Sequence, residues 1–232
     1  MPIDGARVLV FGGSGVLGGL IAGKLQDRGA RVILAGRDPD RLRSRAGALG
    51  PHVPSVIADL SEPHHAAHAV ATTVATLGGI DGLVNAAGVV AFGPLGDTSD
   101  ATLDELASVD LVGPLRLMRE ALEHMDQGGF IVNITGIVAE QPMAGVAPYS
   151  AMKAGLSAAT VALGREVRRQ GVHVLDARPP HTETGLADRA IAGSAPNFKP
   201  GLDPDHVAAT IVEGLVAGKR ELPGEAFTPS GG

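Results

Sequence analysis

Six short runs rich in Val, Ile and Leu alternate along the chain with Ala-rich stretches of helical length. This rhythm constrains the fold most, because a strand, a helix and a parallel strand in succession form right-handed crossover units that assemble into one sheet. We therefore predict a doubly wound α/β fold, with a mostly parallel sheet and helices on both faces. The predicted strands are residues 7–11, 31–36, 53–58, 81–85, 130–135 and 172–177.

The length and composition favour one domain over residues 1–232. Aromatic residues make up only 3% of the chain, so the core must be built from small aliphatic side chains, as in a parallel sheet covered by helices. Residues 179–202 mix Pro, Gly and polar residues over an unusually long connection, and we predict a substrate lid there. We expect a last helix at 203–217 and a short strand within 221–232.

Composition also excludes several classes of protein. The chain has no cysteine, so it can form neither a disulfide framework nor a thiolate metal site. Its net charge is -6 with no basic block, which argues against a nucleic-acid partner. No segment offers the roughly 20 apolar residues that a membrane span requires. We expect a cytoplasmic protein with no membrane partner.

Glycines crowd the turn after the first predicted strand, in the stretch FGGSGVLGG. Such a turn lets the backbone approach a pyrophosphate, and the following helix presents unpaired N–H groups to it. The placement between a strand and a helix, with a second strand ending about 20 residues on, is what a dinucleotide site requires. The predicted contacts in this loop are Gly12, Gly13, Ser14, Gly15, Leu17 and Gly18.

The end of the second predicted strand indicates which dinucleotide binds. An NAD site places a carboxylate there for the ribose 2'-hydroxyl, but Ala35 and Gly36 fill this place and Arg37 follows. A guanidinium can bind a 2'-phosphate through two parallel hydrogen bonds, so we favour NADP(H) over NAD(H). Two alternatives stay open: Arg37 is a solvated surface residue, or Asp38 is the ribose ligand instead of a helix cap.

Four further motifs follow in order: Asp59–Leu60 after the third strand, NAAG at 85–88, YSAMK at 149–153 and RPPHTET at 178–184. With the glycine loop, they make the chain resemble the short-chain dehydrogenase/reductase family over nearly its whole length. The resemblance implies a Rossmann-like fold of the single-domain branch. It also implies cofactor contacts from Asp59, Leu60, Asn85, Ala86, Ala87, Gly88, Tyr149, Lys153, Pro179 and Thr184.

Tyr149 and Lys153 lie four residues apart, so on a helix they share one face. A nearby ammonium favours phenolate, and we expect Lys153 to lower the pKa of the Tyr149 phenol toward the working range. Tyr149 can then protonate a carbonyl oxygen, or deprotonate an alcohol in the reverse direction. Tyr149 is the only tyrosine in the chain, which makes the spacing hard to attribute to chance.

Two positions depart from the family pattern. A serine thirteen residues before the tyrosine usually hydrogen-bonds the substrate oxygen, and here that position is Gly136. Losing such a donor costs about 10²- to 10³-fold in rate. The neighbouring Thr135 can replace it only if the strand has ended and Gly136 turns the backbone. Where the family carries a relay asparagine the chain has Asp110, whose charge can pair with Lys153. Asp110 either takes part in a proton relay or is a partly solvated helix carboxylate.

The histidines are weaker candidates. His64 and His68 are spaced for one helix face, but no third ligand is evident apart from Glu62, so we expect an exposed helix face and no metal site. His181 lies in the predicted lid beside the expected nicotinamide site, where it is either functional or an exposed loop histidine.

Together these features predict an NADP(H)-dependent oxidoreductase that interconverts a carbonyl and an alcohol on a small molecule. Its predicted catalytic residues are Tyr149, Lys153, Thr135 and Asp110, with a water as the alternative to Thr135. We also expect a bacterial source and a homodimer or homotetramer. Because the serine and asparagine are missing, two alternatives stay open: a non-redox isomerase, cyclase or lyase, and a nucleotide-binding sensor.

Overall fold

A computed structural model describes residues 1–228, and its strands form one parallel sheet. The sheet has seven strands in the order β3-β2-β1-β4-β5-β6-β7. This order confirms the predicted doubly wound, Rossmann-like α/β fold. The strands are β1 (Arg7–Phe11), β2 (Arg31–Gly36), β3 (Ser55–Ile57), β4 (Gly82–Asn85), β5 (Phe130–Ile134), β6 (His173–Ala177) and β7 (Glu221–Leu222).

Helices connect these strands. They are α1 (Val16–Gln26), α2 (Pro39–Leu49), α3 (His65–Leu77), α4 (Asp100–Ala107), α5 (Gly113–Leu122), α6 (Ala147–Glu166) and α7 (Pro204–Val216). A single π-helical turn, Ser108–Val112, joins α4 to α5. Short 3₁₀ turns lie at Leu95–Asp97, Ile137–Ala139, Val167–Gln170, Ala187–Arg189 and Gly224–Phe227. None of the helices in residues 1–228 is long and apolar enough to cross a membrane.

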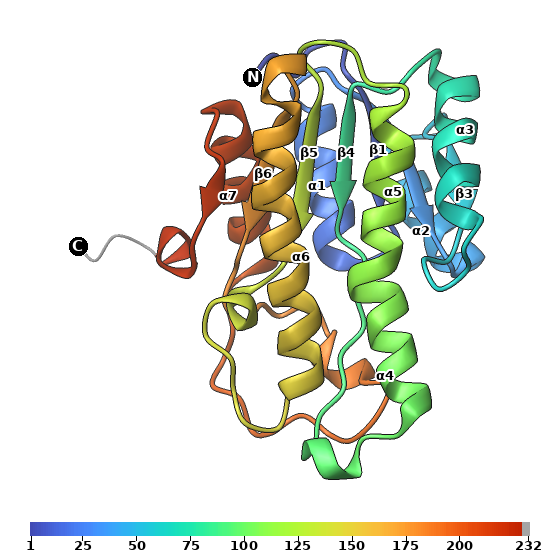
Figure 1. Cartoon of the computed structure of the whole chain (residues 1–232). Coiled ribbons are helices and arrows are strands. Elements are labelled where there is room, and N and C mark those ends of the chain that lie inside the picture. The colour runs from blue at the N-terminus through green and yellow to red at the C-terminus, as the bar shows by residue number, and fades with distance from the viewer. Residues whose placement is uncertain (229–232) are drawn as a thin grey trace.

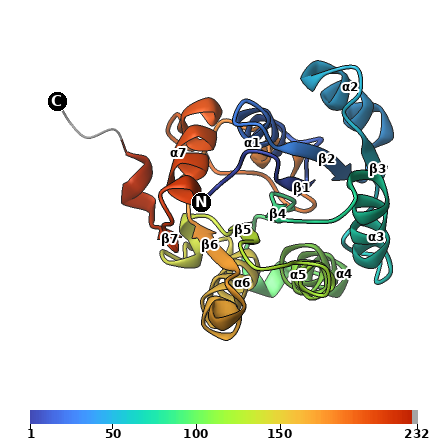
Figure 2. The same ribbon diagram turned by 90° about the horizontal axis from the view of Figure 1, so that it is seen from above.

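The helices cover both faces of the sheet, as Figure 2 shows from above. Alternate residues of β1 point to opposite faces: Val8 and Val10 pack in the cluster with α1, α2 and α7, whereas Leu9 and Phe11 pack in the cluster with α3, α5 and α6. All four side chains are at most 2% exposed. Burial on both faces explains why the strands read as continuous apolar runs.

Several predicted strand boundaries move by one or two residues: β3 ends at 57, β4 begins at 82 and β6 begins at 173. Two further shifts have identifiable reasons. The third strand begins at Ser55 and not at 53, because Pro54 has no N–H to donate to the sheet. The fifth ends at Ile134 and not at 135, since Gly136 turns the chain with a φ of 80°. The last helix and terminal strand are where we predicted them, and residues 229–232 lie outside the described part of the chain.

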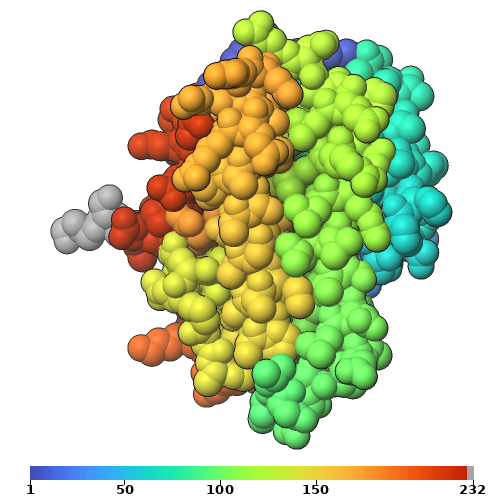
Figure 3. Space-filling view, viewed as in Figure 1, coloured from blue at the N-terminus to red at the C-terminus, as the bar shows by residue number. Residues whose placement is uncertain are grey.

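The strand order reverses between β1 and β4, and this arrangement fixes where a ligand can bind. The connections that follow β4, β5 and β6 gather at the lower end of the molecule in Figure 1, beyond the carboxyl ends of the strands. Helices α5 and α6 cover the face seen in Figure 3, in green and orange, and α6 reaches down to these connections. The predicted lid, 179–202, is mostly irregular and pairs with residues 90–92 through Ile191 and Ala192.

Candidate active site

A cavity of about 450 Å³ opens at the carboxyl ends of β1, β4 and β5. It brings together nearly all the predicted cofactor residues: Gly12, Ser14, Gly15, Leu17, Gly18, Arg37, Asp59, Leu60, Ala86, Ala87, Gly88, Tyr149, Lys153, Pro179 and Thr184. Two predicted contacts lie behind its wall. Gly13 packs under Leu34, and Asn85 is buried in the sheet, where it donates to Asn133. Asn85 and Gly13 therefore shape the site without lining it.

The glycine loop presents the start of α1 to this cavity. Gly15 is the N-cap of α1, and neither a capping side chain nor an acidic residue in the first turn occupies the helix terminus. Gly12 has a φ of 82°, and a Cβ there would lie 2.5 Å from the backbone nitrogen of Ala87. A Cβ on Gly18 would collide with the carbonyl of Gly12. The loop therefore requires glycine, and the free N–H groups behind it fit an anionic pyrophosphate.

At the end of β2, where we expect the ribose, the cavity is lined by a cation and by no carboxylate from β2. A Cβ on Gly36 would lie 2.7 Å from the hydroxyl of Ser14, so an acidic side chain does not fit there. Asp38 also lines the cavity, and it caps α2 by accepting hydrogen bonds from the backbone of Asp40 and Arg41, which favours the helix-cap alternative. Arg37 lines the cavity with a 58% exposed side chain, 3.7 Å from Glu105.

The turn after β3, where the resemblance implies contacts to adenine, forms another part of the cavity wall. Asp59 and Leu60 line the cavity as predicted. The Asp59 carboxylate accepts hydrogen bonds from the backbone N–H and the hydroxyl of Ser61, at 2.9 and 2.8 Å. His65 in turn accepts from the Asp59 backbone N–H. These bonds fix the turn and leave the second carboxylate oxygen of Asp59 available to a ligand.

Tyr149 and Lys153 share one face of α6, as their spacing predicts. The Lys153 ammonium lies 5.8 Å from the centre of the Tyr149 ring and donates to the Ile134 carbonyl at 3.3 Å. It also pairs with Asp110 at 3.1 Å, and Asp110 is fully buried. The expected ion pair is therefore present, whereas a partly solvated Asp110 is excluded.

The Tyr149 phenol is harder to ionise than its spacing to Lys153 led us to expect. Burial raises the pKa of Tyr149, the Lys153 ammonium lowers it, and the Asp110 carboxylate raises it again, with a net upward shift. Burial also opposes the charge of Lys153, but Asp110 and Tyr149 outweigh it and raise the pKa of Lys153. Without a ligand, the pair is thus a protonated phenol beside an ammonium.

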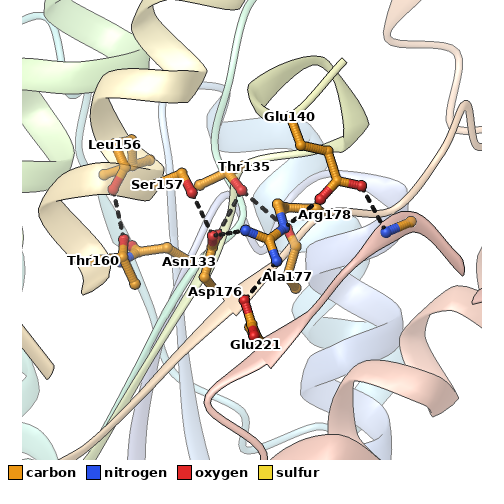
Figure 4. A network of polar contacts seen from close by, with 11 residues as sticks. Asn133, Thr135, Glu140, Leu156, Ser157, Thr160, Asp176, Ala177, Arg178 and Glu221 are labelled. Atoms are coloured by element: carbon orange, nitrogen blue, oxygen red, sulfur yellow. Dashed lines mark hydrogen bonds and ion pairs between the residues drawn. The ribbon is translucent and has the colours of Figure 1, made fainter. Parts of the chain in front are cut away.

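Thr135 does not present its hydroxyl to this site. Figure 4 shows that the hydroxyl points to Asp176, to which it donates at 2.5 Å, and Ser157 donates to the same carboxylate at 2.6 Å. Arg178 approaches Asp176 at 3.4 Å. Thr135 is fully buried. The geometry counts against the predicted catalytic role, because the hydroxyl already belongs to a buried carboxylate network.

Gly136 turns the backbone, which is the condition under which Thr135 could replace the serine. The turn does not bring the Thr135 hydroxyl into the site, however, and it leaves an open space there. Its φ of 80° and ψ of 161° lie in a region that is essentially restricted to glycine. A Cβ at Gly136 would meet only the Pro179 carbonyl, at 3.8 Å, and Val138, at 4.0 Å. The site therefore has room for a small molecule such as water at the position of the missing side chain.

Another part of the cavity wall is apolar and aromatic. Phe92 and Phe198 pack with ring centres 6.0 Å apart, and His181 packs on Phe198 at 4.8 Å. These three residues line the cavity together with Met143 and Val146. His181 thus faces the site, which agrees with the prediction that it lies beside the nicotinamide site. Such a wall suits an apolar substrate with few polar groups.

The other histidines lie elsewhere. His64 is the N-cap residue of α3, and both His64 and His68 are exposed. Within residues 1–228, no group of three or more His, Cys, Asp or Glu side chains is placed to hold a metal ion.

Comparison with known proteins identifies the family. The model of the short chain dehydrogenase family matches residues 6–194. The chain therefore belongs to the short chain dehydrogenase family. An uncharacterized oxidoreductase of Staphylococcus aureus is 30% identical over 220 residues, which cover 93% of each chain. Carbonyl reductase family member 4 of Xenopus tropicalis is 31% identical over 209 residues, or 88% of each chain.

A solved short chain dehydrogenase from Burkholderia cenocepacia in complex with NADP is 27% identical and has a TM-score of 0.84. The alignment covers 98% of the present chain and 100% of that one. Family membership, the names of these relatives and this fold support an oxidoreductase with a nicotinamide cofactor. The match also extends to the carboxyl-terminal part of the chain, beyond the region covered by the family model.

Sequence reasoning missed several residues of this dehydrogenase site. Arg41 and Arg189 line the cavity together with Arg37. The network of Asp176 with Thr135 and Ser157 joins residues far apart in sequence, so no local pattern reveals it. The aromatic wall comes from two irregular segments, for which periodicity carries no signal.

Proposed function

We propose that this short-chain dehydrogenase is an NADP(H)-dependent oxidoreductase that interconverts a carbonyl and an alcohol on a small, largely apolar molecule. One observation carries the proposal: the Tyr149–Lys153 pair opens onto the same cavity as the uncapped start of α1 and Arg37. Proton-transfer groups and a nucleotide cradle thus share one space. A homodimer or homotetramer, a cytoplasmic location and a bacterial source stay predictions.

The chain's own residues have distinct roles in this reaction. A bound nicotinamide supplies the hydride in the reducing direction. Tyr149 donates its phenolic proton to the carbonyl oxygen, and Lys153 stabilises the phenolate that remains. Lys153 would also bind a ribose hydroxyl through its ammonium, as the family resemblance implies. The start of α1 holds the pyrophosphate through backbone N–H groups, and Arg37 holds a 2'-phosphate.

We propose that a water replaces the hydroxyl of the missing serine. The open space beside Gly136 can hold it, and the Pro179 carbonyl can accept a hydrogen bond from it. Thr135 is committed to Asp176 and is therefore a less suitable donor. A mobile water orients the carbonyl less well than a fixed hydroxyl, so we expect a lower turnover than a serine would give.

Cofactor choice is tested by titrating NADPH and NADH and following the fluorescence of the reduced nicotinamide. We expect tighter binding of NADPH, and Arg37→Ala should weaken it about 10- to 100-fold, because a charge-assisted hydrogen bond contributes about 1.5–3 kcal/mol. Binding of NADH should change little.

Arg43→Ala is the matched control, since Arg43 lies close to Arg37 in sequence, on the exposed surface of α2, and its ion pair within residues 1–228 is with Asp40. Equal affinities of the unaltered protein for NADPH and NADH would refute the NADP assignment.

A second candidate function rests on the missing donor at Gly136. A pocket that binds the nucleotide but no longer transfers hydride would serve as a nucleotide sensor, or as a non-redox isomerase, cyclase or lyase with Tyr149 as its acid. Screening aliphatic and aromatic ketones with NADPH, and the matching alcohols with NADP⁺, separates the two candidates. Tight NADPH binding with no change in nicotinamide absorbance for any compound would favour the second.

A further inference from the structure

Asp110 is a buried carboxylate with an unusual environment. It lies in the π-helical turn between α4 and α5 and is fully buried. One oxygen, Oδ1, lies 3.1 Å from the Lys153 ammonium and accepts from the Val89 backbone at 3.3 Å. The other oxygen, Oδ2, has no hydrogen-bond partner among the described residues. A buried charge is costly unless it is paired, so Lys153 is the reason that this carboxylate is tolerated.

The backbone also keeps this pair close together. A Cβ on Gly88 would lie 2.9 Å from the Asp110 carboxylate and 3.3 Å from the Lys153 ammonium. The loop after β4 therefore closes over the ion pair and leaves little space around it. Asp110 does not line the cavity, so it can affect a ligand only through Lys153 and Tyr149.

The charged groups around the pair are few, and they come from the elements packed against it. Lys153 and Tyr149 belong to α6, Glu105 to α4, and Asp176 to β6. Glu105 adds negative potential at Asp110, and Asp176 adds it at Lys153. Lys153 is the one cation among them, and it is 5.8 Å from the Tyr149 ring centre.

We propose that Asp110 is a positioning residue that cancels the charge of Lys153, so that the Tyr149 phenol keeps its proton and the site is set to donate it. The proposal rests on the proposed function and deepens it. A lone ammonium beside a phenol favours phenolate, whereas an ammonium held by a buried carboxylate does so weakly. The site is then poised for carbonyl reduction, and alcohol oxidation requires more alkaline solution.

The sign of the effect follows from the charges. Burial and the Asp110 carboxylate raise the pKa of Tyr149, whereas the Lys153 ammonium lowers it. Replacing Asp110 with a neutral residue removes an upward contribution, so phenolate should form at lower pH. Burial also raises the pKa of Asp110 itself, so its negative charge, and with it the effect on Tyr149, disappears in acid.

The chain offers a direct measurement, because Tyr149 is its only tyrosine and it has no tryptophan. Phenolate absorbance in the near ultraviolet therefore reports this one side chain, without any turnover. In the unaltered, ligand-free protein, we expect no phenolate until the pH exceeds about 10, where a free tyrosine ionises. Phenolate at neutral pH in the folded protein would overturn the proposal.

The variant Asp110→Asn keeps the size of the side chain and removes its charge. We expect its phenolate midpoint to fall by about 1 pH unit or more, a tenfold change in the acid dissociation constant. Asp104→Asn is the matched control, because it removes the same charge from an exposed position of α4 and should leave the midpoint in place. A midpoint that stays or rises in Asp110→Asn, or falls equally in both variants, would overturn the proposal.

Folding is checked by circular dichroism at each pH. If Asp110→Asn does not fold, Asp110→Ala and the titration of the unaltered protein keep the test decisive. In a working reductase, the alkaline limit of ketone reduction should move to lower pH by the same amount in Asp110→Asn, and Asp110→Glu should restore it in part. Absence of turnover would count against the proposed function alone, since the absorbance titration needs no substrate.

Discussion

Two adjacent residues decide how far this site departs from its relatives. Thr135 has a hydroxyl, but Asp176 holds it at 2.5 Å in a buried network. Gly136 has no side chain, and its backbone lies in a region that other residues rarely adopt. Both effects follow from tertiary structure. The sequence reveals the missing serine, but it cannot tell which way the threonine points, because that depends on β6, some 40 residues away.

Restoring the serine at Gly136 tests the value of the lost donor. Gly136→Ser and Gly136→Ala should both lower the free energy of unfolding by about 1–3 kcal/mol, since either side chain is strained at this backbone geometry. Only serine adds a hydroxyl. We expect kcat/KM for ketone reduction to be higher in Gly136→Ser than in Gly136→Ala.

Because both variants carry the same backbone strain, the difference between their rates reports the hydroxyl alone. Urea unfolding gives the stabilities, and steady-state kinetics on the folded protein gives the rates. Equal rates in the two variants would mean that a hydroxyl at residue 136 does not reach the substrate oxygen.

At the scale of single elements, most helices and strands could be predicted from the sequence. The helix predicted to carry Tyr149 and Lys153 is α6, and its spacing alone places both residues on one face. The π-helical turn that buries Asp110 was not predictable, since its extra residue leaves no pattern in the sequence. For the same reason, the ion pair was foreseen but its burial was not.

The start of α2 offers a prediction about one element. Asp38 accepts hydrogen bonds from two backbone N–H groups, so Asp38→Ala should lower the free energy of unfolding by about 0.5–2 kcal/mol. We propose that Asp38 serves the helix and not the ribose, so the ratio of NADPH to NADH affinity should stay unchanged.

The control for this change is Asp40→Ala, which removes a neighbouring carboxylate that caps nothing. Urea unfolding and cofactor titration are the two measurements. A large shift in cofactor preference in Asp38→Ala would show that its carboxylate acts on the ribose after all.

For the whole molecule, the sheet order explains why residues from distant parts of the chain form one site. Parallel strands direct their carboxyl ends to one side, and the reversal between β1 and β4 leaves a crevice there. Motif order therefore identified residues that nearly all line one cavity. The aromatic wall of Phe92, His181 and Phe198 was not predictable, because it depends on how the connection after β6 folds back onto residues 90–92.

The most direct test of the account replaces Tyr149 with Phe and measures ketone-dependent loss of NADPH absorbance, with the ketones that the unaltered protein reduces. Removing a general acid should slow this reaction about 10²- to 10⁴-fold, while NADPH binding, measured by fluorescence, stays within a few-fold of the unaltered protein. An equal rate in Tyr149→Phe, with cofactor binding intact, would contradict the central claim that this phenol donates the proton in hydride transfer.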